Sequence, residues 1–295
     1  MRTEAAEPRL LSVQPFKKQL LKWVGNKQRF AHEIGSYLPE RGGTYFEPFL
    51  GSAAVLGTLA PARAIASDAF EPLMGIWQTL HDEPDTLKAW YESRYYRYWA
   101  ADTRTAGFEE IKADYNRNPN PADLLFISRS CYGGVVRFRS RDGYISTPCG
   151  PHKPVSPASF AERVDIWSER TQGAKFECMG YREALNLAGP GDVVYCDPPY
   201  VHTQAILYGA QRFRLPELLE CIADAKRRGV FVALSIDGSK KSGNQICDLP
   251  IPDGLFELEV LVNVGRSMLR RFQMQGESLE GEVVRDRLLL TSEPC

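Results

Sequence analysis

A carboxylate, two prolines and a tyrosine directly follow a short apolar run, and this order suits chemistry on an amino group attached to an aromatic ring. Residues 193–196 form the run, and Asp197, Pro198, Pro199 and Tyr200 come next. Such an amine is a poor nucleophile because its lone pair is delocalised into the ring. The Asp197 carboxylate and the Pro198 carbonyl can each accept one N–H, and the prolines hold these acceptors still because they fix φ. Tyr200 can stack on a base that has left its duplex.

A second motif is needed, because a proline pair after a strand more often simply ends the strand. Residues 44–46 read as a short strand, and the turn that follows contains Glu47, Phe49 and Gly51. An apolar helix comes after this turn. Small residues at positions 51–53 let the backbone approach a ligand closely, as they do in nucleotide-binding βα turns.

An acidic residue ends the next predicted strand, which covers residues 63–67. This residue is Asp68. In doubly wound folds a carboxylate at this place accepts the hydroxyls of a ribose. Taken alone, Asp68 reads more simply as the N-cap of a helix that begins at Ala69. Because the small-residue turn precedes it, we favour the ribose role.

Three motifs in the same order resemble those of a known family. They are the segment 21–27 (LKWVGNK), the turn 47–51 and the tetrapeptide 197–200. They are similar to the KWxGxK, FxGxG-type and DPPY motifs of Dam-like DNA adenine-N6 methyltransferases, the D12 class with alpha-order motifs. The resemblance spans residues 17–292, and it implies N6 methylation of adenine at a specific DNA sequence.

The same resemblance implies that S-adenosylmethionine is the methyl donor. Trp23 then packs near the cofactor adenine or its methionine portion, Lys27 reaches the cofactor carboxylate and Asp68 holds the ribose. Outside the motif, Trp23 reads as a core or lid residue and Lys27 as a solvated helix start. The residues expected at the cofactor site are Trp23, Gly25, Lys27, Glu47, Phe49, Gly51, Asp68 and Asp197. One position departs from the family: Gly180 stands where many relatives have an aspartate at the cofactor adenine, which leaves the cofactor affinity open.

The expected fold is α/β, a Rossmann-like S-adenosylmethionine-dependent methyltransferase fold with an inserted, mainly helical target-recognition module that carries a β-hairpin. We expect a discontinuous catalytic domain, residues 17–80 and 174–292, and an inserted domain, residues 81–173. Hydrophobic spacing predicts helices at 84–98, 108–117, 121–131, 157–171 and 215–228. It predicts strands at 174–178, 192–196, 230–235, 256–262 and 284–290, and a hairpin at 137–148.

Two basic stretches suggest a surface for double-stranded DNA in a chain whose net charge is only −1. Residues 1–29 carry seven Lys or Arg against two Glu, and residues 129–153 carry five against one Asp. Such stretches favour phosphate binding that depends on salt. The predicted hairpin brings together Arg137, Arg139, Arg141 and Tyr144. An arginine on a two-stranded ribbon can read guanine in the major groove, and equally it can contact phosphate alone.

Composition indicates a globular enzyme, with 43% hydrophobic and 25% charged residues. Seven scattered cysteines without a CxxC pair disfavour a disulfide framework and a zinc site. No apolar run suggests a signal peptide or membrane span, so we expect a cytoplasmic protein. We also expect a monomer, and no metal, because the sulfonium of the implied methyl donor is already activated. A partner restriction endonuclease is an open expectation. Methylation of cytosine N4, methylation of a protein glutamine and a catalytically silent DNA-binding relative also remain open.

Overall fold

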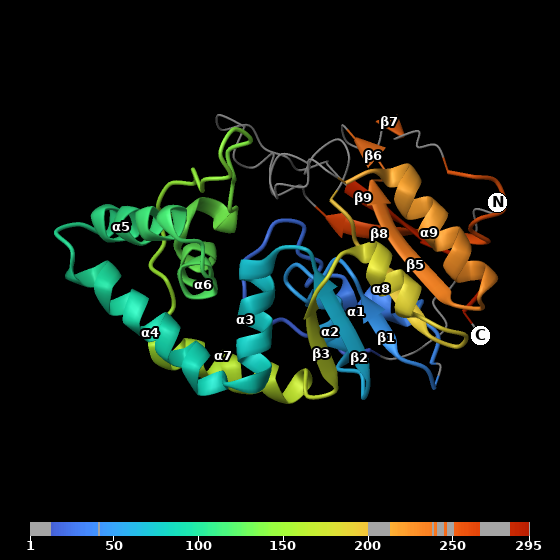
Figure 1. The fold of residues 1–295 in the computed structure, drawn as a ribbon, viewed down its shortest axis with the longest axis horizontal. Helices are drawn as coiled ribbons and strands as arrows, with labels where there is room; N and C mark the ends of the chain where they lie inside the picture. The colour runs from blue at the N-terminus through green and yellow to red at the C-terminus, as the bar shows by residue number, and fades with distance from the viewer. Residues whose placement is uncertain are drawn as a thin grey trace.

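A seven-stranded sheet forms the centre of the computed structural model, which describes residues 13–40, 42–199, 213–237, 239–240, 245–246, 251–265 and 284–294 (Figure 1). The strand order is β3-β2-β1-β4-β5-β9-β8. The first five strands pair in parallel, and β9 is antiparallel to both of its neighbours. The strands are β1 Tyr45–Glu47, β2 Ala64–Asp68, β3 Ala174–Cys178, β4 Val193–Cys196, β5 Phe231–Asp237, β8 Leu258–Gly265 and β9 Val284–Leu290. This confirms the expected α/β class with a mostly parallel sheet.

Helices cover both faces of the sheet because its strands are apolar on both sides. Every residue of β4 is buried, as expected for a central parallel strand. One face packs against α8 (Tyr181–Leu187) and α9 (Leu215–Arg227), and the apolar stripe of α9 is Leu215, Leu218, Leu219, Ile222 and Ala225. The other face packs against α1 (Ala31–Ser36), α2 (Ala54–Leu59) and α3 (Glu71–Asp82).

Four further helices lie beyond α3, between β2 and β3 in the chain, and form the left-hand part of Figure 1. They are α4 Pro84–Ala100, α5 Arg104–Arg117, α6 Pro121–Ser130 and α7 Pro157–Arg170, and the 3-10 turn η1 Tyr132–Gly134 follows α6. Their apolar side chains belong to the same buried cluster as those of α1–α3. The indoles of Trp77 on α3 and Trp167 on α7 lie 5.3 Å apart. The helices are therefore packed firmly onto the sheet domain, while the boundaries at residues 81 and 173 stay predictions.

The predicted hairpin at residues 137–148 is an antiparallel loop and not a regular two-stranded ladder. A single bridge joins Phe138 and Ile145, and a second joins Cys131 and Cys149. Beyond the Phe138–Ile145 bridge, toward the tip of the loop, Arg139 N–H donates to the Tyr144 carbonyl at 2.9 Å. The strands do not extend further because the chain carries a 3-10 turn on one side and prolines at 148, 151 and 154 on the other. A short pair, β6 Ser239–Lys240 and β7 Gln245–Ile246, lies elsewhere.

Two alanines with left-handed backbones border α2. Ala53, at φ 53°, begins the helix, and Ala60, at φ 48°, ends it. The left-handed region costs a residue with a Cβ about 1–2 kcal/mol. Both ends of α2 therefore have a backbone conformation that glycine would adopt more easily.

Replacing Ala60 with glycine is expected to raise the free energy of unfolding by about 1 kcal/mol, because it relieves the left-handed strain at a half-buried position. Ala53→Gly is the matched control. Its methyl group is fully buried, so the lost packing offsets the relieved strain and the change should lie near zero. Urea denaturation measures both values, and an Ala60→Gly variant less stable than the wild type would contradict the assignment of strain.

Candidate active site

The parallel strands end at one edge of the sheet, and the candidate residues lie at or just past these ends. Glu47 and Asp68 are the last residues of β1 and β2, and Asp197 directly follows β4. Gly180 comes two residues after β3. Strands β1 and β4 are neighbours in the sheet. The chain continues from β1 toward β2 on one side and from β4 toward β5 on the other, so the strand order reverses between β1 and β4. In open α/β sheets, ligands bind outside the carboxyl ends of the strands at this point.

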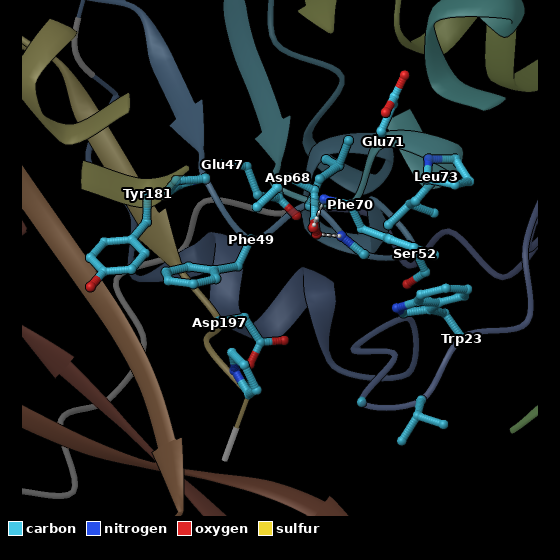
Figure 2. A pocket seen from close by; sticks show the side chains of 18 of the residues that line it. Trp23, Glu47, Phe49, Ser52, Asp68, Phe70, Glu71, Leu73, Tyr181 and Asp197 are labelled. Carbon is cyan, nitrogen blue, oxygen red and sulfur yellow. Dashed lines mark hydrogen bonds between the residues drawn. The ribbon is translucent and has the colours of Figure 1, made fainter. Parts of the chain in front are cut away.

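A cavity of about 960 Å³ opens at this edge. Figure 2 shows Asp68, Trp23 and Asp197 around it, with Phe49 and Tyr181 on the side away from Trp23. The volume suits a ligand of the size of a nucleoside with a side chain. Residues from the helical part of the chain, among them Tyr115, Phe138 and Gly143, also line it.

Asp197 makes a close ion pair with a buried lysine. Lys27 Nζ lies 2.8 Å from Asp197 Oδ1 and 3.6 Å from Asp286 Oδ2, and it also donates to the Gly25 carbonyl at 3.3 Å. Burial alone would lower the pKa of Lys27, but the two carboxylates outweigh it and raise that pKa. Lys27 therefore stays protonated and fixes the orientation of Asp197. Its contact with a cofactor carboxylate stays a prediction.

Glu47 is buried beneath the turn and is occupied by structural contacts. Its Oε2 accepts the Tyr45 hydroxyl at 2.7 Å and the Leu56 N–H at 2.9 Å, so it ties the end of β1 to the first turn of α2. Burial raises the pKa of Glu47 to about 8, although both hydrogen bonds lower it. The residue lines the cavity, and its contact with a cofactor stays a prediction.

Asp68 connects two loops at the cavity wall. Its carboxylate accepts the Gly51 N–H at 3.2 Å and the Phe70 N–H at 3.1 Å (Figure 2). Burial raises the pKa of Asp68 to about 6 despite these hydrogen bonds. Helix α3 begins at Glu71 with Phe70 as its N-cap, so Asp68 is not the N-cap of a helix that begins at Ala69. Each carboxylate oxygen has a second lone pair for a ligand hydroxyl.

The expected glycines permit close packing around the indole of Trp23. Gly51 has φ 49°, and a Cβ on it would lie 3.3 Å from Trp23 Cδ1. The Gly51 carbonyl accepts the indole N–H of Trp77 at 3.1 Å. Trp23 itself is buried and its ring lies 6.3 Å from that of Phe70. Gly25, with φ 78°, turns the segment toward Lys27.

Three aromatic rings form the wall near Gly180. Phe49 stacks on Tyr181 with 5.2 Å between the centroids, and Phe213 meets Phe49 edge-on at 5.9 Å. Gly180 is the N-cap of α8 and lines the same cavity. A Cβ at Gly180 would meet no atom within 4 Å. Glycine therefore leaves open space beside a flat apolar surface that suits an aromatic heterocycle.

The motif residues that meet at this edge match a known family. A model of the D12 class N6 adenine-specific DNA methyltransferases matches residues 23–245, which is well over half of the chain. The chain belongs to this family. The match includes the segment of Trp23 and Lys27, the turn at Gly51 and the tetrapeptide at Asp197, and it also includes helices α4–α7.

Curated relatives carry names from the same class. The chain is similar to the DNA N-6-adenine-methyltransferase of Escherichia phage P1, with 26% identity over 249 residues that cover 80% of this chain and 32% of the relative. The DNA adenine methylase of Vibrio cholerae is 27% identical over 74% of this chain and 82% of its own length. The chain spans about a third of the phage P1 relative and 63% of the retron Ec67 DNA adenine methylase of Escherichia coli.

In this family member, the expected DNA-contacting arginines lie together on the loop at 137–144. Arg139 and Arg141 both pair with Asp142, at 3.0 and 3.2 Å, and the Arg139 guanidinium lies 5.1 Å from the centre of the Tyr144 ring. Arg137 is exposed and has no side-chain partner among the described residues. Arg129, counted in the same basic stretch, is buried and donates to the carbonyls of Gln19 and Leu20, so it is not part of a DNA-facing surface.

Some of the predicted residues lie outside the described part of the chain, and some site residues were not predicted from the sequence. Tyr200 and the basic segment 1–12 lie outside the described residues. Asp286, Tyr181 and Phe70 were not anticipated. A signal existed for Asp286, because it alternates in phase with Leu288 and Leu290 along strand 284–290, and a carboxylate on a buried face is unusual without a partner. Within the described residues, no helix is both long and apolar enough to cross a membrane, and no group of three or more His, Cys, Asp or Glu is placed to hold a metal ion.

Proposed function

We propose that this protein transfers a methyl group from S-adenosylmethionine to N6 of adenine within a specific sequence of double-stranded DNA. The observation that carries the proposal is the position of Asp197. It lies at the mouth of the cavity, at the point where the sheet changes direction, and the Lys27 ion pair fixes its orientation. Membership of the D12 class supports adenine as the target.

The residues around the cavity fit S-adenosylmethionine. The Asp68 carboxylate suits the ribose hydroxyls, and the stacked rings of Phe49 and Tyr181 suit the adenine. The carboxylate of Asp197 lines the cavity and suits the neighbourhood of a sulfonium cation. When bound, the cofactor supplies a methyl group that is already activated for attack.

The chain's own residues prepare the amine for this attack. Asp197 has one oxygen on Lys27, and its other oxygen can accept an N–H of the target amine. The Pro198 carbonyl accepts the second N–H, and the nitrogen lone pair then points away from the ring. The nitrogen gains positive charge as its new bond forms, and it later releases a proton by way of Asp197 to solvent. Catalysis rests on position and electrostatics.

We further propose that the loop at 137–144, together with helices α4–α7, forms the target-recognition domain of residues 81–173. Arg137 and Tyr144 are exposed at the loop, and Phe138 packs edge-on against Phe70 at 5.4 Å. Because Phe70 directly precedes α3 and contacts Trp23, the loop is fixed to the cofactor side of the cavity. This packing supports the proposal, because DNA bound at the loop would lie on the same side of the cavity as Phe70 and Trp23.

The proposal is tested by offering DNA, RNA and protein to the purified enzyme with tritiated S-adenosylmethionine. We expect label in double-stranded DNA alone. Label in protein would indicate a glutamine methyltransferase, and an absence of label in every acceptor, with cofactor still bound, would indicate a catalytically silent relative.

Arg137→Ala is expected to lower kcat/KM for DNA about tenfold, because this guanidinium is the one on the loop that Asp142 does not hold. Arg141→Ala, which removes an arginine already paired with Asp142, is the matched control and should have a smaller effect. Methylation of a randomised DNA pool at two salt concentrations identifies the contact. Relaxed preference at one base pair indicates base reading, whereas a uniform loss with a flatter salt dependence indicates phosphate binding. An unchanged kcat/KM would exclude Arg137 from the interface.

A further inference from the structure

Two cysteines lie opposite each other at the base of the segment that carries the loop at 137–144. Cys131 and Cys149 form an antiparallel bridge, and we call this pair the neck of the loop. Their sequence neighbours make the hydrogen bonds of the bridge, which run from Tyr132 N–H to the Pro148 carbonyl at 2.9 Å and from Gly150 N–H to the Ser130 carbonyl at 2.8 Å. The two cysteines therefore occupy a non-hydrogen-bonded position of the antiparallel pair.

The backbone at the neck has the spacing that a disulfide requires. At a non-hydrogen-bonded position the Cα atoms lie about 4.5 Å apart and the two side chains lie on the same face of the ladder. A disulfide needs a Cα separation of about 4.4–6.8 Å. The spacing of the cysteines along the sequence does not show this arrangement, because it arises only when the chain returns to form the bridge.

The two thiols differ in their exposure, and this sets the order in which they react. Cys149 is partly exposed, and its Sγ lies 3.7 Å from the Tyr98 hydroxyl. Cys131 is only 5% exposed. Burial raises the pKa of the Cys131 thiol to about 12, and the nearby Cys149 adds to the rise. Because the thiolate is the nucleophile in disulfide exchange, Cys149 reacts first and Cys131 follows slowly.

We propose that Cys131 and Cys149 are a modification site, at which a small-molecule disulfide such as oxidised glutathione converts the two thiols into a disulfide across the neck. The Cys149 sulfur attacks the oxidant, one glutathione thiolate leaves, and a mixed disulfide forms. The Cys131 sulfur then attacks Cys149 Sγ, and the second glutathione leaves. The two protein thiols lose two protons and two electrons, and the oxidant becomes two molecules of reduced glutathione.

The bond would restrain the segment that carries the exposed side chains of Arg137 and Tyr144. A disulfide stabilises a protein mainly because it restricts the unfolded chain, and here it would close the segment 131–149. Since Cys149 is partly exposed, a reductant can reach the bond and reverse it. The neck is then covalently closed under oxidising conditions and open under reducing ones. This inference does not depend on the proposed function.

The test incubates the reduced protein with increasing ratios of oxidised to reduced glutathione and blocks the remaining thiols with iodoacetamide. Mass spectrometry of the unreduced digest then identifies the products. We expect a peptide pair linked through Cys131 and Cys149, with two hydrogens lost and no glutathione kept at the neck. The linked protein should have a Tm about 5 °C above that of the reduced protein. Linkage should form faster as the pH rises, because Cys131 must lose its proton.

Two variants separate the two steps. In Cys131→Ser, Cys149 should keep glutathione as a stable mixed disulfide, because no second thiol displaces it. In Cys149→Ser, the buried Cys131 should stay unmodified. Cys178→Ser removes an exposed thiol at the end of β3 and should form the linkage as the wild type does.

Two results with the wild-type protein would overturn the proposal. One is glutathione kept on Cys149 without linkage to Cys131. The other is linkage that appears only after the protein has been unfolded in urea. Because the linked peptide is detected in the wild type itself, the test remains decisive if a cysteine variant does not fold.

Discussion

Asp197→Asn is expected to lower the methylation rate at least about 100-fold while DNA and cofactor still bind. The amide has the volume of the carboxylate but not its charge, so it polarises the amine poorly and leaves Lys27 with less compensation. A positioned acid–base group contributes roughly 10² or more to the rate. Single-turnover methylation of DNA measures the effect. Asn is preferred to Ala, because loss of a partner from a buried ion pair costs about 3–5 kcal/mol of stability.

The control for Asp197→Asn replaces another buried acid, one that does not line the cavity. Glu259→Gln serves this purpose, because it breaks an ion pair with Arg287 in the same sheet. Both variants should bind cofactor, and only Asp197→Asn should lose the chemical step. A folded Asp197→Asn enzyme that retains more than a tenth of the wild-type rate would rule out the assigned role.

Asp68→Ala is expected to weaken cofactor binding about 100-fold with a smaller change in the rate at saturation. Hydrogen bonds to a charged group contribute about 1.5–3 kcal/mol each, and the ribose hydroxyls are remote from the methyl group. Isothermal titration measures the Kd. The variant also loses the link between Gly51 and Phe70, so Asp68→Asn, which keeps the shape, separates the loop contacts from the charge.

The pH dependence provides a second readout for Asp68. Its pKa in the folded protein is about 6, above the usual 3.8, so the folded protein takes up this proton first as the pH falls. The stability that this group contributes therefore rises as the pH falls from 6 toward 4. Its strength as an anionic acceptor falls over the same range. Cofactor affinity should weaken below pH 6 in the wild type and much less in Asp68→Asn. If the affinities of the two proteins change with pH in the same way, Asp68 holds the two loops together but does not bind the cofactor.

Several strands and helices could be predicted from the sequence because they depend on local patterns. Strands 174–178 and 284–290 have the predicted bounds, and the helix predicted at 215–228 is observed at Leu215–Arg227. Helix α5 begins at Arg104, four residues before the prediction, because Thr103 caps it by accepting the Ala106 N–H. The capping side chain marks the start of the helix in the sequence, but a prediction from hydrophobic spacing alone does not use it.

The contacts of the site could be predicted less well, because they join distant parts of the chain. Nothing in the spacing of Lys27 shows that its ammonium lies on Asp197, 170 residues away. Asp286 reaches Lys27 because β9 lies between β5 and β8 in the sheet. The sequence of an antiparallel strand does not show between which other strands it is inserted. Charge counting also failed for Arg129, because a linear stretch does not show which side chains are buried.

Nucleoside mass spectrometry of DNA methylated by the purified enzyme tests the central claim most directly. The wild-type enzyme and Asp197→Asn are each incubated with double-stranded DNA and isotopically labelled S-adenosylmethionine, and the DNA is digested to nucleosides. We predict labelled N6-methyladenine with the wild type and at least a 100-fold lower yield with the variant. Label in N4-methylcytosine, or N6-methyladenine formed equally well by the variant, would contradict the account.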